Sequence, residues 1–202
     1  MGQPPIRYLI LPGWKGSAAN HWQTHWQYCL PNARRVEQDD WTYPDCRRWQ
    51  QALEQQVLAS PSPVIVIAHS LGCLTLAHWA ARAGTTALKR LRGALLVAPA
   101  DVERADCPPP LQNFAPIPRM RLPFPSLLIG SDNDPAASPG KALELAGYWG
   151  CEARILTGAG HINVASGHHC WASGFAYLYQ LQTLIGQQDR TAVAEKSHAS
   201  PS

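Results

Sequence analysis

Short apolar runs that alternate with longer helical patterns limit most strongly how this chain can fold. Two of the runs, residues 64–68 and 93–98, are apolar without alternation, as expected for strands buried on both faces of a parallel sheet. The expected strands are residues 6–11, 34–36, 64–68, 93–98, 126–130 and 152–156, and the expected helices are 46–59, 71–83, 139–149 and 171–185. This alternation predicts an α/β fold, a three-layer sandwich whose mostly parallel sheet of about six strands has helices on both faces.

The length of the chain predicts one domain. Its 202 residues can bury one substantial core, and we expect residues 1–186 to form it. Residues 187–202 are polar and almost free of large apolar groups, so we expect a disordered C-terminal tail. Residues 99–125 contain eight prolines, which oppose both helix and inner strand. We therefore expect an irregular connection there, too short for a helical cap domain.

Composition and charge disfavour several classes of partner. The 17 Lys and Arg against 14 Asp and Glu are scattered, so we expect no nucleic-acid partner. No apolar run approaches the ~18 residues of a membrane span, and no secretory signal is recognisable at the N-terminus. The six cysteines form no C-x-x-C pair, which favours reduced thiols and a cytoplasmic protein. His168-His169-Cys170 lacks a neighbouring ligand set, so we expect no metal and no cofactor.

The sequence Ala68-His69-Ser70-Leu71-Gly72 stands where an apolar strand passes into a helical pattern. It matches the G-x-S-x-G nucleophile elbow, with alanine in the first position. Such a turn places the serine Oγ exposed above the sheet, at a helix N-terminus that favours developing negative charge. The alternative is a serine that only caps the helix. Its position after an all-apolar strand favours Ser70 as a nucleophile.

A serine nucleophile needs a base, which an acid orients. In α/β-hydrolases the order along the chain is Ser, acid, His, each at the carboxyl end of a strand. His161 follows the expected strand at residues 152–156, and the glycines beside it leave the loop free to bring the imidazole over Ser70. His69 is expected to pack or to form a hydrogen bond rather than to act in catalysis.

The residues alone leave three candidates for the acid. Asp132 and Asp134 both follow the expected strand at residues 126–130, and Asp101 follows the preceding one. Pro135 biases Asp134 toward an extended backbone, whereas Asp132 could accept backbone N–H bonds within the turn. The sequence therefore favours Asp134 and keeps the other two open.

An acyl-transfer site also needs donors for the oxyanion. One expected donor is the backbone N–H of Leu71, directly after the nucleophile. The second is expected in the glycine-containing loop at residues 11–17, where the N–H of Trp14 is best placed. The alternative for this loop is an ordinary strand-to-helix turn.

Further motifs extend this pattern along the chain. They are Leu11-Pro12-Gly13-Trp14, His21-Trp22, Asp40-Trp41 with Pro44 and Trp49, Ser131-Asp132-Asn133-Asp134-Pro135 and Gly160-His161. With the elbow, they resemble a family of small, lidless serine hydrolases that includes retinoblastoma-binding protein 9 and bacterial proteins of the YdeN type. The resemblance covers residues 6–185 and implies an α/β-hydrolase fold without a cap domain and a triad of Ser70, Asp134 and His161. It implies no particular substrate.

These features together predict a serine hydrolase that cleaves small carboxylic esters through an acyl-enzyme on Ser70. A small-molecule ester or amide is the expected partner. Two alternatives stay open. One is an amidase or aminopeptidase-like hydrolase with the same residues. The other is a catalytically weak binding scaffold, whose partners dock on exposed aromatic residues around Trp41 and Trp49.

Overall fold

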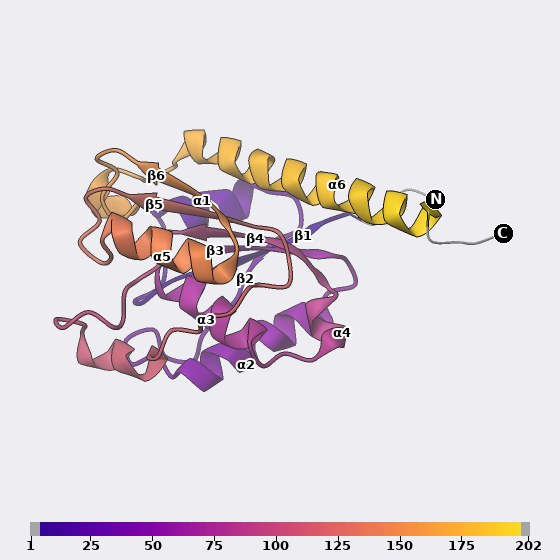
Figure 1. Ribbon diagram of the computed structural model, residues 1–202. Coiled ribbons are helices and arrows are strands. Elements are labelled where there is room, and N and C mark those ends of the chain that lie inside the picture. Colours follow the sequence, from indigo (N-terminus) through magenta and orange to yellow (C-terminus); the bar gives the residue numbers. More distant parts are fainter. Residues whose placement is uncertain (1–4, 199–202) are drawn as a thin grey trace.

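A parallel sheet of six strands runs through the centre of the protein (Figure 1). The structure is a computed structural model and describes residues 5–198. The strands are β1 (Arg7–Leu11), β2 (Ala33–Arg35), β3 (Val64–His69), β4 (Leu91–Val97), β5 (Ser126–Ser131) and β6 (Glu152–Leu156). They lie in the order β2-β1-β3-β4-β5-β6, and each neighbouring pair is parallel. The predicted α/β class and the six strands are confirmed.

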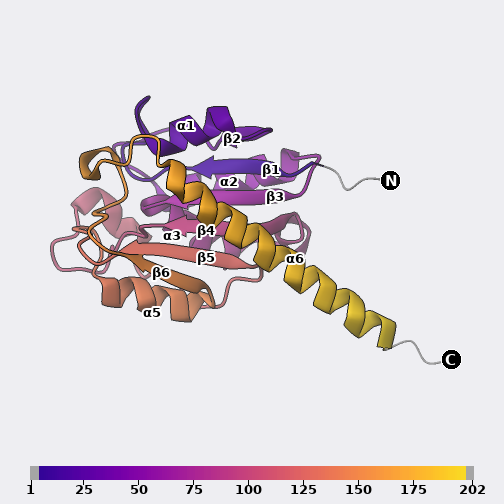
Figure 2. The same ribbon diagram turned by 90° about the horizontal axis from the view of Figure 1, so that it is seen from above.

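Helices cover both faces of the sheet, which gives the predicted three layers (Figures 1 and 2). One face carries α2 (Cys46–Ala59), α3 (Leu71–Ala80), α4 (Thr85–Leu88) and α5 (Pro139–Trp149), and the other carries α1 (Trp22–Cys29) and α6 (Phe175–His198). Local signals set several of their ends. The carboxylate of Asp45 caps α2 by accepting the N–H of Arg48 at 2.9 Å, and α5 ends at Gly150, whose left-handed backbone has φ of 66°.

The core is divided by the sheet into two apolar clusters. Along β1, Leu9 and Leu11 pack with Trp49 of α2, whereas Tyr8 and Ile10 pack with the aromatic residues of α1. Successive strand residues point to opposite faces, so each buried strand supplies both clusters. This explains why the central strands are apolar without alternation.

Helix α1 was not among the expected helices. It has eight residues and begins after His21, whose ring accepts the N–H of Gln23. A helix this short has little stability of its own. The packing of its two fully buried tryptophans, Trp22 and Trp26, stabilises it.

The proline-rich connection contains little regular structure, as predicted. It carries one short 3₁₀ helix, η1 (Pro109–Phe114), and among the described residues it holds no cap domain. The expected helix at residues 71–83 differs in extent. Helix α3 ends at Ala80, and the separate turn α4 follows it.

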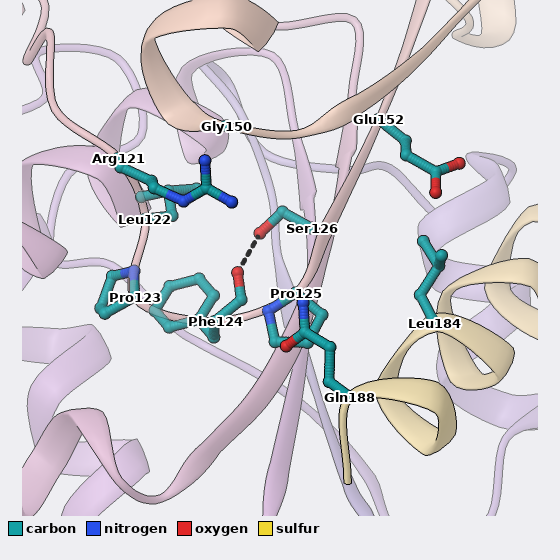
Figure 3. A pocket seen from close by; sticks show the side chains of 10 residues that line it. All are labelled: Arg121, Leu122, Pro123, Phe124, Pro125, Ser126, Gly150, Glu152, Leu184 and Gln188. Carbon is teal, nitrogen blue, oxygen red and sulfur yellow. Dashed lines mark hydrogen bonds between the residues drawn. The ribbon is translucent and has the colours of Figure 1, made fainter. Parts of the chain in front are cut away.

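The disordered tail was predicted from residue 187, and the structure differs. Helix α6 continues to His198, because the segment is rich in residues with good helix propensity and prolongs a helix that is already anchored. Asp189 forms an ion pair with Arg92 of β4. Leu184 and Gln188 line a pocket of about 520 Å³ at the amino ends of β5 and β6 (Figure 3). Residues 1–4 and 199–202 of the predicted domain and tail lie outside the described residues.

Helix α6 is the longest helix that the structure describes. Its described part includes the amide residues Gln187 and Gln188 and the charged residues Asp189 and Arg190. Neither α6 nor any other described helix combines the length and the apolar character that a membrane crossing requires.

Candidate active site

Ser70 lies in the sharp turn between β3 and α3. Its backbone has φ of 53° and ψ of −120°, a strained conformation for a residue with a side chain. The turn is held by a 2.9 Å hydrogen bond from the Ser70 N–H to the carbonyl of Val97. At Gly72, an added Cβ would lie 2.3 Å from the carbonyl oxygen of Leu11. The small residue of the elbow motif is therefore needed for the close approach of α3 to the end of β1.

The structure joins Ser70, His161 and Asp134 in a chain of hydrogen bonds. Ser70 Oγ lies 2.9 Å from His161 Nε2, and His161 Nδ1 lies 2.9 Å from both carboxylate oxygens of Asp134. The side chain of Asp134 is 2% exposed and that of His161 is 15% exposed. With Asp134 as acceptor, the imidazole carries its proton on Nδ1, which leaves Nε2 free to accept the serine proton.

Ser70 is more enclosed than the sequence suggested. We expected its Oγ to stand exposed above the sheet, but the residue is only 9% exposed. The ring of His161 covers it from one side, and the loop at Gly13 covers it from another. Ser70 is therefore largely shielded from solvent.

Of the three candidate acids, Asp134 is the one that contacts the base. Its Oδ1 also accepts the N–H of Ala136 at 2.7 Å, which fixes the carboxylate in an Asx-turn. Asp132 instead accepts the N–H of Gly158 at 2.8 Å. Asp101 accepts the N–H of Glu103 at 3.0 Å within its own turn. The carboxylates of Asp132 and Asp101 therefore bind backbone N–H groups and not the imidazole of His161.

The loop after β5, which carries Asp134, also holds the loop after β6, which carries His161. Three consecutive side chains at the carboxyl end of β5 accept hydrogen bonds from three consecutive backbone N–H groups after β6. The pairs are Asp132 with Gly158 at 2.8 Å, Ser131 with Ala159 at 3.1 Å and Asn133 with Gly160 at 2.7 Å. Sequence reasoning placed Ser131 and Asn133 within a motif but assigned them no role, and the run of polar residues at the end of a buried strand was the available signal.

Two further histidines lie beside the base. The ring centroid of His69 is 4.9 Å from that of His161 and 5.1 Å from that of His21. Burial lowers the pKa of both His69 and His21, that of His21 to about 4, so both are neutral near pH 7. His69 Nε2 lies 2.9 Å from the carbonyl oxygen of His161 and donates to it. The prediction that His69 forms a hydrogen bond rather than acting in catalysis agrees with this contact.

The loop after β1 lies directly against the elbow. A Cβ added to Gly13 would lie 2.7 Å from Ser70 Cβ and 3.2 Å from the backbone nitrogen of Leu71. Within residues 5–198, the backbone N–H groups of Trp14 and Leu71 have no hydrogen-bond acceptor. Trp14 and Leu71 therefore stay the predicted donors for an oxyanion.

The chain after β2 holds this loop in place. The carbonyl of Trp41 accepts the N–H of Lys15 at 2.9 Å, and the carbonyl of Thr42 accepts the indole N–H of Trp14 at 2.8 Å. The ring of Trp41 packs edge-on against Trp49, which is fully buried. Trp49 is therefore a core residue and Trp41 is partly buried against the same core, whereas the neighbouring Tyr43 is 71% exposed. The alternative of a binding scaffold with partners on aromatic residues around Trp41 and Trp49 stays a prediction.

Gly13→Ala should lower kcat by about 10²- to 10³-fold, the loss that follows removal of one oxyanion donor. The new methyl group would lie 2.7 Å from Ser70 Cβ and 3.2 Å from the Leu71 nitrogen, so the loop with the Trp14 N–H would have to move away from the elbow. Gly147→Ala is the matched control, because no atom lies within 4 Å of its added Cβ. It should leave kcat unchanged. Equal ester turnover by the two variants would contradict the assignment of this loop.

The run His168-His169-Cys170 is held by contacts within the protein. His168 Nδ1 lies 3.1 Å from Ser166 Oγ, and the carbonyl of Cys170 accepts the indole N–H of Trp26 at 3.2 Å. Among the described residues, no three His, Cys, Asp or Glu side chains are grouped so that they could bind a metal ion.

Comparison with known proteins assigns the family. A family model described as serine hydrolase matches residues 8–180. The chain belongs to the serine hydrolase family. This serine hydrolase is similar to a YdeN-like hydrolase from Pectobacterium atrosepticum, with 30% identity and a TM-score of 0.77 over 89% of this chain and 92% of the other. No curated protein sequence matched it.

A more distant structure shares the fold. The ydeN gene product of Bacillus subtilis has a TM-score of 0.70 at 19% identity, over 89% of this chain and all of the other. The predicted α/β-hydrolase fold and the resemblance to YdeN-type proteins are therefore confirmed. The likeness to retinoblastoma-binding protein 9 stays a prediction.

Proposed function

We propose that this hydrolase cleaves small carboxylic esters through an acyl-enzyme on Ser70. The observation that carries the proposal is the unbroken chain from Ser70 Oγ to His161 Nε2 and from His161 Nδ1 to Asp134, with 2.9 Å at each step. The two unpaired N–H groups of Trp14 and Leu71 support it. A nucleophile, a base, an orienting acid and oxyanion donors are the parts that acyl transfer requires.

The proposed mechanism has two displacements. In the first, Ser70 Oγ attacks the ester carbonyl carbon while His161 Nε2 takes the hydroxyl proton, and Asp134 stabilises the imidazolium. The oxyanion of the tetrahedral intermediate accepts the N–H groups of Trp14 and Leu71. The intermediate collapses, the C–O bond breaks, and the alcohol leaves with the proton from His161. Water then attacks the acyl-enzyme in the same way and releases the acid.

The partner in this proposal is a small-molecule acyl substrate. Ser70 is only 9% exposed, and in this proposal the carbonyl enters between the loops at Gly13 and His161. Amide substrates require the same residues and differ in the leaving group. We also propose a cytoplasmic location, which the six free cysteines support.

Burst kinetics test this function. With p-nitrophenyl esters of increasing acyl length, the wild-type protein should release about one equivalent of nitrophenolate rapidly and then turn over slowly, as expected where hydrolysis of the acyl-enzyme is slower than its formation. The same panel should include aminoacyl p-nitroanilides. A larger kcat/KM for the anilides than for the esters would assign amidase activity to the protein instead of esterase activity. No release from either panel, together with no labelling by a fluorophosphonate, would contradict the proposal.

A further inference from the structure

The peptide that follows the base is strained and buried. Ile162 has φ of 46°, in the left-handed region where a β-branched residue is an outlier. Its side chain is completely buried. Such a conformation persists only where the surroundings hold it. Because Ile162 follows His161 directly, the contacts that hold it also set the direction in which the imidazole leaves the backbone.

A tryptophan from the opposite end of the chain makes one of these contacts. Trp22, the first residue of α1, is completely buried, and its indole N–H donates to the carbonyl of Ile162 at 2.8 Å. Its ring meets the ring of His69 edge-on, with centroids 5.8 Å apart. His69 in turn lies 2.9 Å from the carbonyl oxygen of His161.

Buried side chains thus hold the backbone carbonyls of two consecutive residues. His69 of β3 binds the carbonyl of His161, and Trp22 of α1 binds the carbonyl of Ile162. If Trp22 lost its N–H, the carbonyl of Ile162 would be buried without this donor, which is unfavourable. The peptide could then rotate to find another donor and leave the strained conformation. Rotation there would move His161 Nε2 away from its 2.9 Å contact with Ser70 Oγ.

We infer that Trp22 is a positioning residue for the general base. Its indole N–H fixes the peptide group between Ile162 and Asn163, and with it the left-handed conformation of Ile162, and thereby aims the imidazole at Ser70. The inference rests on the proposed function, because it concerns the rate of the proton transfers that His161 performs. It assigns a catalytic consequence to α1, which contributes no atom to the reacting centre.

Trp26 provides a matched control on the same helix. It is also completely buried, and its indole N–H also donates to a backbone carbonyl, that of Cys170 at 3.2 Å. Trp22→Phe and Trp26→Phe remove the same group from the same helix. Only Trp22→Phe removes an N–H that binds the residue next to His161.

Trp22→Phe should lower kcat by about 10- to 100-fold, because a displacement of about 1 Å in a reacting group has an effect of this size. KM should change less than about threefold, since Trp22 does not contact substrate. Both acylation and deacylation need His161, so the burst rate and the steady-state rate should fall together. Trp26→Phe should keep kcat within about threefold of the wild-type value, even where the two melting temperatures fall equally.

Equal kcat values in the two variants would overturn the inference. If the wild-type protein shows no turnover that depends on Ser70, the proposed function itself fails. This result differs from a wild-type protein that is active while the two variants have equal kcat values, which overturns only the inference about Trp22. If Trp22→Phe does not fold, Trp22 can be replaced by benzothienylalanine, in which sulfur takes the place of the indole N–H in a ring of similar shape. A folded protein with wild-type kcat would then contradict the role of the N–H, and a lower kcat would support it.

Discussion

Ser70→Ala should abolish labelling by a fluorophosphonate and lower ester turnover by at least ~10³-fold. The substitution removes the only atom that the proposed mechanism acylates. It leaves the oxyanion donors, and these account for the residual rate that such variants retain. Labelling on a gel and kcat for one p-nitrophenyl ester measure the two effects.

Folding must be separated from chemistry in this experiment. Ser70 lies at φ of 53°, and alanine has the same strain there as serine, so the melting temperature should change little. Ser138→Ala is a matched control, because Ser138 caps α5 by accepting the N–H of Lys141 at 3.1 Å. It should lose about 1 kcal/mol of stability and keep its activity. Undiminished labelling of Ser70→Ala would show that another residue is the nucleophile.

Asp134→Asn should lower kcat toward the ~10⁴-fold loss that this change causes in serine proteases. An asparagine amide can donate to His161 Nδ1, which would place the imidazole proton on Nε2 and remove the base that faces Ser70. The geometry itself should survive, because the asparagine oxygen can still accept the N–H of Ala136. Steady-state kcat on a single ester measures the loss.

Asp132→Asn is the internal control for this prediction. Asp132 is two residues away and accepts the N–H of Gly158 at 2.8 Å, a bond that the asparagine carbonyl can also form. Its kcat should therefore fall by less than about tenfold, in contrast to the ~10⁴-fold loss for Asp134→Asn. A larger loss for Asp132→Asn than for Asp134→Asn would mean that the wrong aspartate has been assigned.

The sequence by itself determined the features that depend on local chemistry and on chain order. The apolar runs at residues 64–68 and 93–98 mark central strands, because a strand buried on both faces needs apolar residues at every position. The elbow around Ser70 is visible because its turn requires small neighbours, and Gly72 shows this requirement directly. His161 was predicted because parallel strands bring their carboxyl ends to one edge of the sheet.

The tertiary structure decided what depends on contacts between distant segments. Two aspartates stand two residues apart, and only the approach of the β6 loop shows that Asp134 contacts the imidazole while Asp132 binds Gly158. Helix α1 was missed because packing, not local propensity, stabilises eight residues. The contact of Trp22 with Ile162 spans 140 residues along the chain. A hydrogen bond of this kind depends on where the fold places donor and acceptor, and no spacing within the sequence encodes it.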